Sequence, residues 1–184
     1  MATPSPELQK ITEVLCDFAL TKRFQDSMTK FLELGITGWE KWWQMELAVY
    51  LANSSKIAEW DMEHPFDVDK RKGIAQSRMA LDIGFRMNRH ASDSWYFLEL
   101  KQDNDYKKLL QRMGKDVEKV FSARTRSFDG LKVRYIACAG IFADQGDEYE
   151  NIIEYAEKLM DSIGADSGGV ELEEIGKHHT LIVF

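Results

Sequence analysis

Two short runs in the middle of the chain, 79–85 and 94–101, alternate apolar residues with others at a period of two. This period predicts two β-strands that each turn one face to a core. Each strand places a carboxylate opposite its Leu and Ile side chains, Asp82 in the first and Glu99 in the second. Lys101 follows Glu99 on the same face, roughly 6–7 Å further along. Two carboxylates and an ammonium on adjacent strands predict a divalent-metal site. The expected core-facing side chains are Leu81, Ile83, Phe85, Leu98 and Leu100.

A helix rich in tryptophan is predicted over 38–51, where apolar residues recur at spacings of three and four. Glu46 lies in the middle of this stripe, and its neighbours one turn before and one turn after are aromatic or apolar. An ionised carboxylate is costly to bury there unless it is paired or bound to a metal. We therefore expect Glu46 either to share a metal ion with Asp82 and Glu99 or to be a structural carboxylate bonded to a buried Trp or Lys.

The remaining periodicity predicts alternating helices and strands. Helical spacing runs through 7–34, and 105–123 is an amphipathic helix with its basic residues largely on the outer face. An apolar run over 133–142 predicts a strand buried on both faces. The order of elements predicts an α/β fold with a mixed central β-sheet flanked by helices. Further expected elements are strands at 57–66, 170–172 and 180–184, a helix at 148–163, an exposed turn at 67–72, a loop at 88–93 and a turn at 127–130.

Composition is that of an ordinary globular protein. A length of 184 residues with 44% hydrophobic residues predicts a single domain over 1–184 with a sizeable core. The two cysteines, Cys16 and Cys138, lie among apolar neighbours and are expected to be reduced, which favours a cytoplasmic protein. No run of eighteen apolar residues and no basic-then-apolar leader is present, so neither a membrane span nor a secretory signal is expected.

The net charge of −7 weighs against a nucleic-acid partner, but the charge is unevenly distributed. Residues 101–134 carry ten Lys/Arg against five Asp/Glu, whereas 144–177 carry eleven Asp/Glu against two Lys/Arg. This asymmetry predicts one surface for polyanions and a second, acidic C-terminal surface for a protein partner. The cations expected to contact nucleic-acid phosphates are Lys107, Lys108, Arg112, Lys115 and Lys119.

The order of these features resembles the PD-(D/E)XK nuclease superfamily over about residues 38–143. A helix glutamate is followed by an aspartate on one strand and Glu-x-Lys on the next, and then by a helix and another strand. The resemblance implies a restriction-endonuclease-like αβββαβ core, with a helical segment at 7–34 before it and an acidic helix and strand extension at 144–184 after it. The chain departs from the superfamily pattern at Leu81, where a proline often precedes the aspartate.

By this resemblance, Asp82, Glu99, Lys101 and Glu46 are the expected catalytic residues, and Mg²⁺ or Mn²⁺ is the expected cofactor. The implied metal ligands are the carboxylates of Asp82, Glu99 and Glu46 and the backbone carbonyl near Leu100. The implied activity is hydrolysis of phosphodiester bonds in nucleic acid, with DNA as the expected substrate. Two other functions stay open. One is a noncatalytic acidic protein, such as an immunity protein or inhibitor, that binds a basic partner such as a toxin. The other is a phosphate-ester enzyme that acts on nucleotides.

Overall fold

The computed structural model describes residues 3–67, 78–121, 130–144, 146–164, 169–176 and 178–184. None of the helices in these ranges is long and apolar enough to cross a membrane. The helices described are α1 (Pro6–Ala19), α2 (Lys22–Leu34), α3 (Glu40–Asn53), α4 (Tyr106–Phe121) and α5 (Tyr149–Ser162). The strands described are β1 (Ile57–Asp67), β2 (Arg78–Met87), β3 (Ser94–Gln102), β4 (Lys132–Ala143), β5 (Glu171–Glu174) and β6 (His179–Val183).

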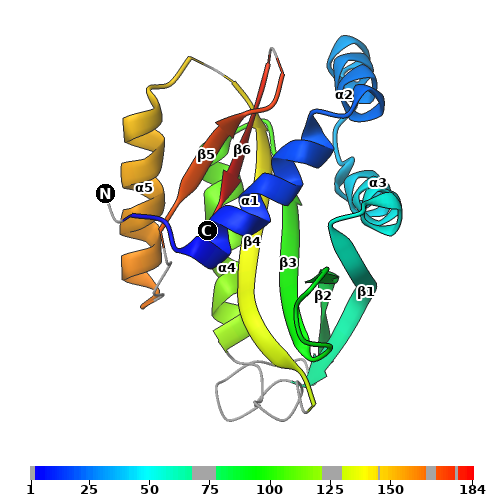
Figure 1. Cartoon of the computed structure of the whole chain (residues 1–184). Coiled ribbons are helices and arrows are strands. Elements are labelled where there is room, and N and C mark those ends of the chain that lie inside the picture. The colour runs from blue at the N-terminus through cyan, green and yellow to red at the C-terminus, as the bar shows by residue number, and fades with distance from the viewer. Residues whose placement is uncertain (1–2, 68–77, 122–129, 145, 165–168, 177) are drawn as a thin grey trace.

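The six described strands form one mixed sheet in the order β1-β2-β3-β4-β6-β5. Strands β3 and β4 are parallel, with α4 between them in the sequence, and every other neighbouring pair is antiparallel. Helices α1 and α3 pack on one face of the sheet, and α4 and α5 pack on the other (Figure 1). The predicted α/β class, with a mixed sheet flanked by helices, is confirmed.

Strand β4 contributes to the cores on both faces, as its apolar run predicts. Ala137, Ala139 and Ile141 join the cluster formed with α1 and α3. Cys138, a free thiol, and Phe142 join the cluster formed with α4 and α5. The strand next to β3 is therefore held from both sides, which gives β3 a rigid neighbour.

The helical segment predicted at 7–34 consists of two helices, α1 and α2. Thr21 has an extended backbone, and its hydroxyl accepts a hydrogen bond from the N–H of Phe24 at 3.4 Å, which begins α2. The ring of Phe24 then stacks on Trp42 of α3, with centroids 5.6 Å apart. Helix α3 is thus buried on two sides, against α2 through Trp42 and against the sheet through residues such as Trp43.

The other predicted helices and strands occur close to their expected positions. The tryptophan helix predicted at 38–51 is α3, and the amphipathic helix predicted at 105–123 is α4. The exposed turn predicted at 67–72 and the turn predicted at 127–130 fall almost entirely outside the described residues.

Strands β2 and β3 run side by side for only three residue pairs, 83–85 opposite 96–98. Gly84 permits the close pairing, because a Cβ at this position would lie 2.7 Å from the ring of Phe97. Towards Asp82 the paired register of the two strands ends. We call the place where it ends, at Asp82 and Glu99, the fork.

The facing of side chains along β2 changes at the fork. Ile83 and Phe85 join the core against α1 and α3, as predicted, but Leu81 packs with Phe66 of β1 in a separate cluster. The expectation that all three β2 side chains share one face is therefore wrong. Opposite this point, Glu63 of β1 has a left-handed φ of 55°. A left-handed residue inside a strand rotates the side chains after it relative to those before it.

Helix α4 lies close to the sheet because the β4 position beneath it is a glycine. A Cβ at Gly140 would lie 2.6 Å from the Sδ of Met113 and 2.8 Å from a methyl carbon of Leu109. Gly140 is also the register partner of Lys101 in β3. The side chains of α4 are thereby placed beside the predicted site.

Candidate active site

Asp82 and Glu99 meet at the fork, on the side of the sheet that α4 covers. The Oδ2 of Asp82 accepts a hydrogen bond from the backbone N–H of Leu100 at 2.7 Å. Because β2 no longer pairs with β3 at this level, the Asp82 side chain supplies the acceptor that a neighbouring strand would otherwise provide. The carboxylate of Asp82 is therefore fixed at the fork, next to Glu99.

Of the carboxyl groups in the described residues, Glu99 has the most strongly shifted pKa. Burial raises the pKa of its carboxyl, and the neighbouring Asp82 raises it further, to about 9, against the opposing effect of Lys101. The side chains of Glu99 and Asp82 interact directly, and their like charges make it costly to ionise both. Adjacent carboxyls that resist simultaneous ionisation are typical of metal-binding and acid–base sites.

Lys101 is surrounded by oxygen atoms. Its Nζ lies 3.1 Å from Asp116 Oδ2 and 3.9 Å from Glu99 Oε2. The same atom lies 3.5 Å from Glu40 Oε1 and donates a hydrogen bond to the carbonyl of Leu100 at 3.0 Å. Burial lowers the pKa of the Lys101 ammonium, but the three carboxylates, Asp116 most of all, outweigh burial and raise it. Lys101 is therefore a fixed cation at neutral pH.

Asp116 is a member of this cluster that the sequence analysis missed. It lies on α4 and is only 5% exposed, and its two oxygens contact Lys101 and Lys119. The sequence carries a signal for it, because Asp116 interrupts the apolar stripe of an amphipathic helix between Met113 and Val117. A carboxylate in such a stripe needs a buried partner, and Lys101 is that partner.

The acid that α3 brings to the site is Glu40, in its first turn. Glu40 Oε2 accepts hydrogen bonds from the backbone N–H of Gln102 at 3.2 Å and from Arg112 Nη2 at 3.0 Å. The N–H of Gly38 in turn donates to Gln102 Oε1 at 3.1 Å. The start of α3 is thereby tied to the end of β3. The sequence signal for Glu40 is its spacing from Gln44, one turn further along on the sheet side.

Glu46 does not join the cluster. Its Oε1 accepts a hydrogen bond from Arg23 Nη2 of α2 at 2.6 Å. Helix α3 turns Gln44 and Leu47 to the sheet, whereas Glu46 lies on the side that contacts α2. The expectation that Glu46 is a catalytic residue and metal ligand beside Asp82 is corrected. The alternative expectation of a structural carboxylate is closer, with an arginine in place of a tryptophan or lysine.

The predicted phosphate-binding cations all lie on α4, but most are paired with acids of the protein. Arg112, Lys119 and Lys108 each lie within 4.0 Å of an acidic oxygen. Lys107 and Lys115 are exposed, and neither has an ion pair among the described residues. Two of the five cations therefore keep an unneutralised charge on this face.

The side chains at the fork that could bind a metal ion are carboxylates, which are the donors that hard cations such as Mg²⁺ prefer. Within the described ranges, no group of three or more His, Cys, Asp or Glu side chains is arranged to hold a metal ion. Asp82 and Glu99 form a pair of carboxylate donors, and Mg²⁺ is commonly held by one or two carboxylates together with waters and substrate phosphate. The Leu100 carbonyl, also a predicted ligand, accepts its hydrogen bond from Lys101. Asp82 and Glu99 are therefore the carboxylates that would bind a Mg²⁺ or Mn²⁺ ion at the fork.

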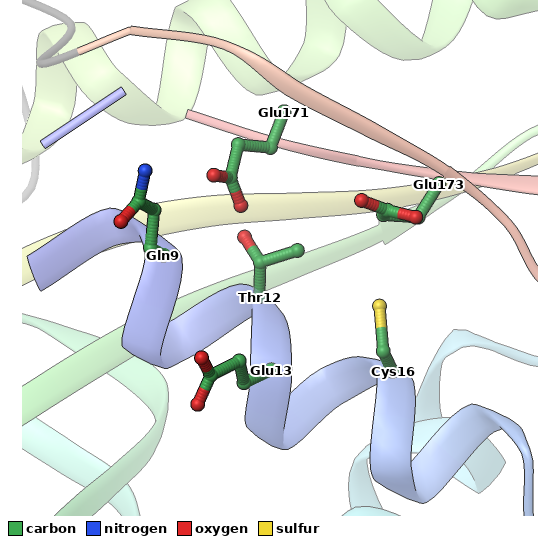
Figure 2. A pocket seen from close by; sticks show the side chains of 6 residues that line it. All are labelled: Gln9, Thr12, Glu13, Cys16, Glu171 and Glu173. Carbon is green, nitrogen blue, oxygen red and sulfur yellow. The ribbon is translucent and has the colours of Figure 1, made fainter. Parts of the chain in front are cut away.

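A separate hollow of about 350 Å³ lies between α1 and β5, on the opposite face of the sheet (Figure 2). Burial, followed by the charges of Glu173, Glu171 and Asp17, raises the pKa of the free Cys16 thiol in its wall to about 11. The thiol therefore stays protonated at neutral pH and is a poor nucleophile. The hollow presents an acidic surface. Its lining residues are Gln9, Thr12, Glu13, Cys16, Glu171 and Glu173.

Comparison with known proteins assigns no relative to the chain. No protein-family model matches it, and neither the curated proteins nor the solved structures contain a significant match.

Proposed function

We propose that this protein is a metal-dependent nuclease that hydrolyses phosphodiester bonds of nucleic acid, with DNA as the expected substrate. The observation that carries the proposal is the meeting of Asp82, Glu99 and Lys101 at the fork. These are the three residues that the resemblance to the PD-(D/E)XK superfamily assigns to metal binding and catalysis. Their roles as catalytic residues stay predictions.

The order of elements supports the same proposal. The run α3-β1-β2-β3-α4-β4 follows the αβββαβ order of a restriction-endonuclease-like core, and β3 and β4 are parallel. We propose that about 38–143 form such a core. Strands β6 and β5 extend its sheet beyond β4. In this arrangement Glu40, from the first turn of α3, replaces Glu46 as the helix acid.

The acidic and basic residues of the fork have different proposed roles. Asp82 and Glu99 would hold the Mg²⁺ or Mn²⁺ ion through their carboxylates. The ion would supply Lewis-acid polarisation of the phosphate and a bound water of lowered pKa. Lys101 remains protonated between Asp116 and Glu40, so it contributes positive charge next to the reacting phosphate instead of removing a proton. Lys107 and Lys115 would contact backbone phosphates without reading sequence.

A noncatalytic acidic protein that binds a basic partner is the second candidate function. Two observations favour it. The cations of α4 are largely neutralised within the protein, and the hollow between α1 and β5 collects three glutamates that have no ion pair among the described residues. An acidic surface of this kind attracts a basic partner and disfavours acidic ones.

The two candidates are separated by a cleavage assay with purified protein. Supercoiled DNA, linear DNA and RNA are incubated with Mg²⁺, Mn²⁺ or EDTA, and the products are resolved on gels. We expect cleavage with either metal and none in EDTA. Asp82→Ala and Lys101→Ala should each lower the rate by about 10²-fold or more, because charge stabilisation of a transition state typically contributes that much.

Matched controls guard against a contaminating nuclease. Glu118→Ala on α4 and Lys30→Ala on α2 change exposed charges away from the fork and should cleave like the wild type. Equal cleavage by the wild type and both fork variants would refute the proposal. A wild type that leaves DNA and RNA intact with either metal would favour the binding protein.

A further inference from the structure

Gln44 is a buried polar side chain of α3, and both polar atoms of its amide form hydrogen bonds. The residue is 3% exposed. Its Oε1 accepts a hydrogen bond from Lys41 at 2.6 Å. Its Nε2 donates to Glu63 Oε1 at 3.0 Å and to the backbone carbonyl of Asp82 at 2.7 Å. One amide thus joins α3, β1 and β2 at a residue of the fork.

The β1 partner of Gln44 is backbone-strained. Glu63 has a φ of 55° inside a strand, a conformation that glutamate rarely adopts. Its carboxylate is held by Lys41 as well as by Gln44. Strained residues of this kind persist where neighbours over-determine them, and they concentrate at functional sites. The strain lies next to the position where the pairing of β2 with β3 ends.

Both the backbone carbonyl and the carboxylate of Asp82 accept hydrogen bonds. Its carbonyl accepts from Gln44, and its carboxylate accepts from the N–H of Leu100. If the Gln44 bond is lost, the Asp82 carbonyl is left without this donor, and rotation of the peptide towards another donor moves the side chain off Leu100. The hydrogen bond at Leu100 therefore reports on Gln44 through Asp82.

We propose that Gln44 is a positioning residue: it fixes the Asp82 peptide so that the Asp82 carboxylate stays at the fork beside Glu99. The proposal rests on the proposed nuclease function for its catalytic consequence. Its structural consequence, the orientation of Asp82, stands independently of any activity. Gln44 itself does not touch the reacting atoms.

The first test measures amide hydrogen exchange by nuclear magnetic resonance in metal-free protein. In Gln44→Met, which keeps the length of the side chain, exchange at the Leu100 amide should become about tenfold faster, because the Asp82 acceptor is no longer held. The amides of Tyr96 and Leu98, in the paired part of β3, serve as internal references. Gln111→Met, on the exposed face of α4, is the matched control. Unchanged exchange at Leu100 would overturn the proposal.

A double variant, Gln44→Glu with Glu63→Gln, tests whether Gln44 positions Asp82 or only links α3 to β1. The pair can still bond to each other and to Lys41, but position 44 no longer has a donor for the Asp82 carbonyl. We expect exchange at Leu100 to stay fast in the double variant although the fold is intact. If Gln44→Met does not fold, this variant carries the test. Recovery of wild-type exchange would mean that Gln44 only ties α3 to β1, which refutes the inference.

Cleavage kinetics add the catalytic arm. In Gln44→Met, kcat for DNA cleavage should fall about tenfold with KM unchanged, because the substrate contacts on α4 are untouched. A purely structural role would lower the melting temperature and leave kcat at low temperature as in the wild type. A wild type that cleaves nothing, together with faster Leu100 exchange in Gln44→Met, would refute the nuclease function and leave the positioning of Asp82 standing.

Discussion

Glu7 of α1 and Glu99 of β3 lie on opposite faces of the sheet, and their pKa values move in opposite directions. Burial raises the pKa of Glu7, but hydrogen bonds from Tyr96, Arg134 and Lys10 outweigh it and lower the pKa to about 2. Glu99 is buried beside Asp82, and its pKa rises to about 9. Folding favours the ionised form of Glu7 and disfavours the ionised form of Glu99. The second condition is the one that points to function.

The two carboxyls also differ in the partners that surround them. Glu7 accepts hydrogen bonds from Tyr96 at 2.5 Å and from Lys10 at 3.2 Å. The bond from Tyr96 of β3 ties α1 to the sheet. At the fork, acids outnumber bases: Lys101 is the shared partner of three carboxylates. Such a surplus destabilises the protein unless a ligand offsets it.

The largest expected effect comes from neutralising Glu99. Under the proposed function, Glu99→Gln should lower metal-dependent cleavage by about 10²-fold or more, because it removes a carboxylate that is proposed to bind the metal. The melting temperature in EDTA should stay the same or rise, since the variant no longer forces a carboxyl against Asp82. Cleavage assays and thermal unfolding of both proteins check the two halves. A clear loss of stability in EDTA without loss of cleavage would reverse the assignment of Glu99.

Neutralising Glu7 should do the opposite. Glu7→Gln should lower the free energy of unfolding by about 1.5–3 kcal/mol, the typical contribution of hydrogen bonds to a charged group, with cleavage unchanged. Urea unfolding measures the difference. The matched control is Glu13→Gln on the exposed side of the same helix. An equal effect in the control would show that the network around Glu7 contributes nothing specific.

The pH dependence of stability sharpens the comparison. The pKa of Glu7 is about 2 in the folded protein against an ordinary 4.5, so its stabilising contribution is complete above about pH 4.5 and is lost as the pH falls towards 2. The stability difference between wild type and Glu7→Gln should therefore shrink on acidification below about pH 5. Unfolding curves at a series of pH values test this. A difference that stays constant down to about pH 3 would contradict the lowered pKa.

A smaller effect is expected at Asp116. Asp116→Asn keeps the size of the side chain but removes the nearest negative charge from Lys101, so kcat should fall about tenfold with KM unchanged. Glu118→Gln on the exposed face of the same helix controls for the loss of a charge from α4. Steady-state kinetics on one DNA substrate distinguish the two. Identical kinetics in both variants would show that Lys101 needs no help from Asp116.

The smallest effect is expected at Glu46. Its partner Arg23 is 72% exposed, and ion pairs of this kind contribute about 0.2–1 kcal/mol. Glu46→Gln should therefore lower the free energy of unfolding by less than about 1 kcal/mol and leave cleavage within about twofold of wild type. Unfolding and cleavage assays are sufficient. A loss of cleavage as large as that of Glu99→Gln would restore Glu46 to the site.

Much of the fork was predictable because a strand has a period of two. The alternation along β3 places Glu99 opposite Leu98 and Leu100, as the structure has it, and Asp82 does lie beside Glu99. Along β2 the alternation breaks at Leu81, so the position of the Asp82 carboxylate depends also on the change of facing at the fork. The helix acid was not predictable in the same way. Glu40 and Glu46 lie on different sides of α3, and both sides are buried, one by the sheet and one by α2. Apolar periodicity identifies buried sides, but it does not say which neighbour covers each one.

The sequence by itself determined the types of element and their order, because local periodicity and turn residues act over a few residues. It also determined that acidic side chains would lie on the two central strands. The tertiary structure alone decided that Glu40 and Asp116 meet Lys101, and that Gln44 reaches Asp82. These contacts join residues between 15 and 61 positions apart in the chain. They depend on how α3 and α4 are rotated against the sheet, and that rotation is set by packing around residues such as Gly140 rather than by any local pattern.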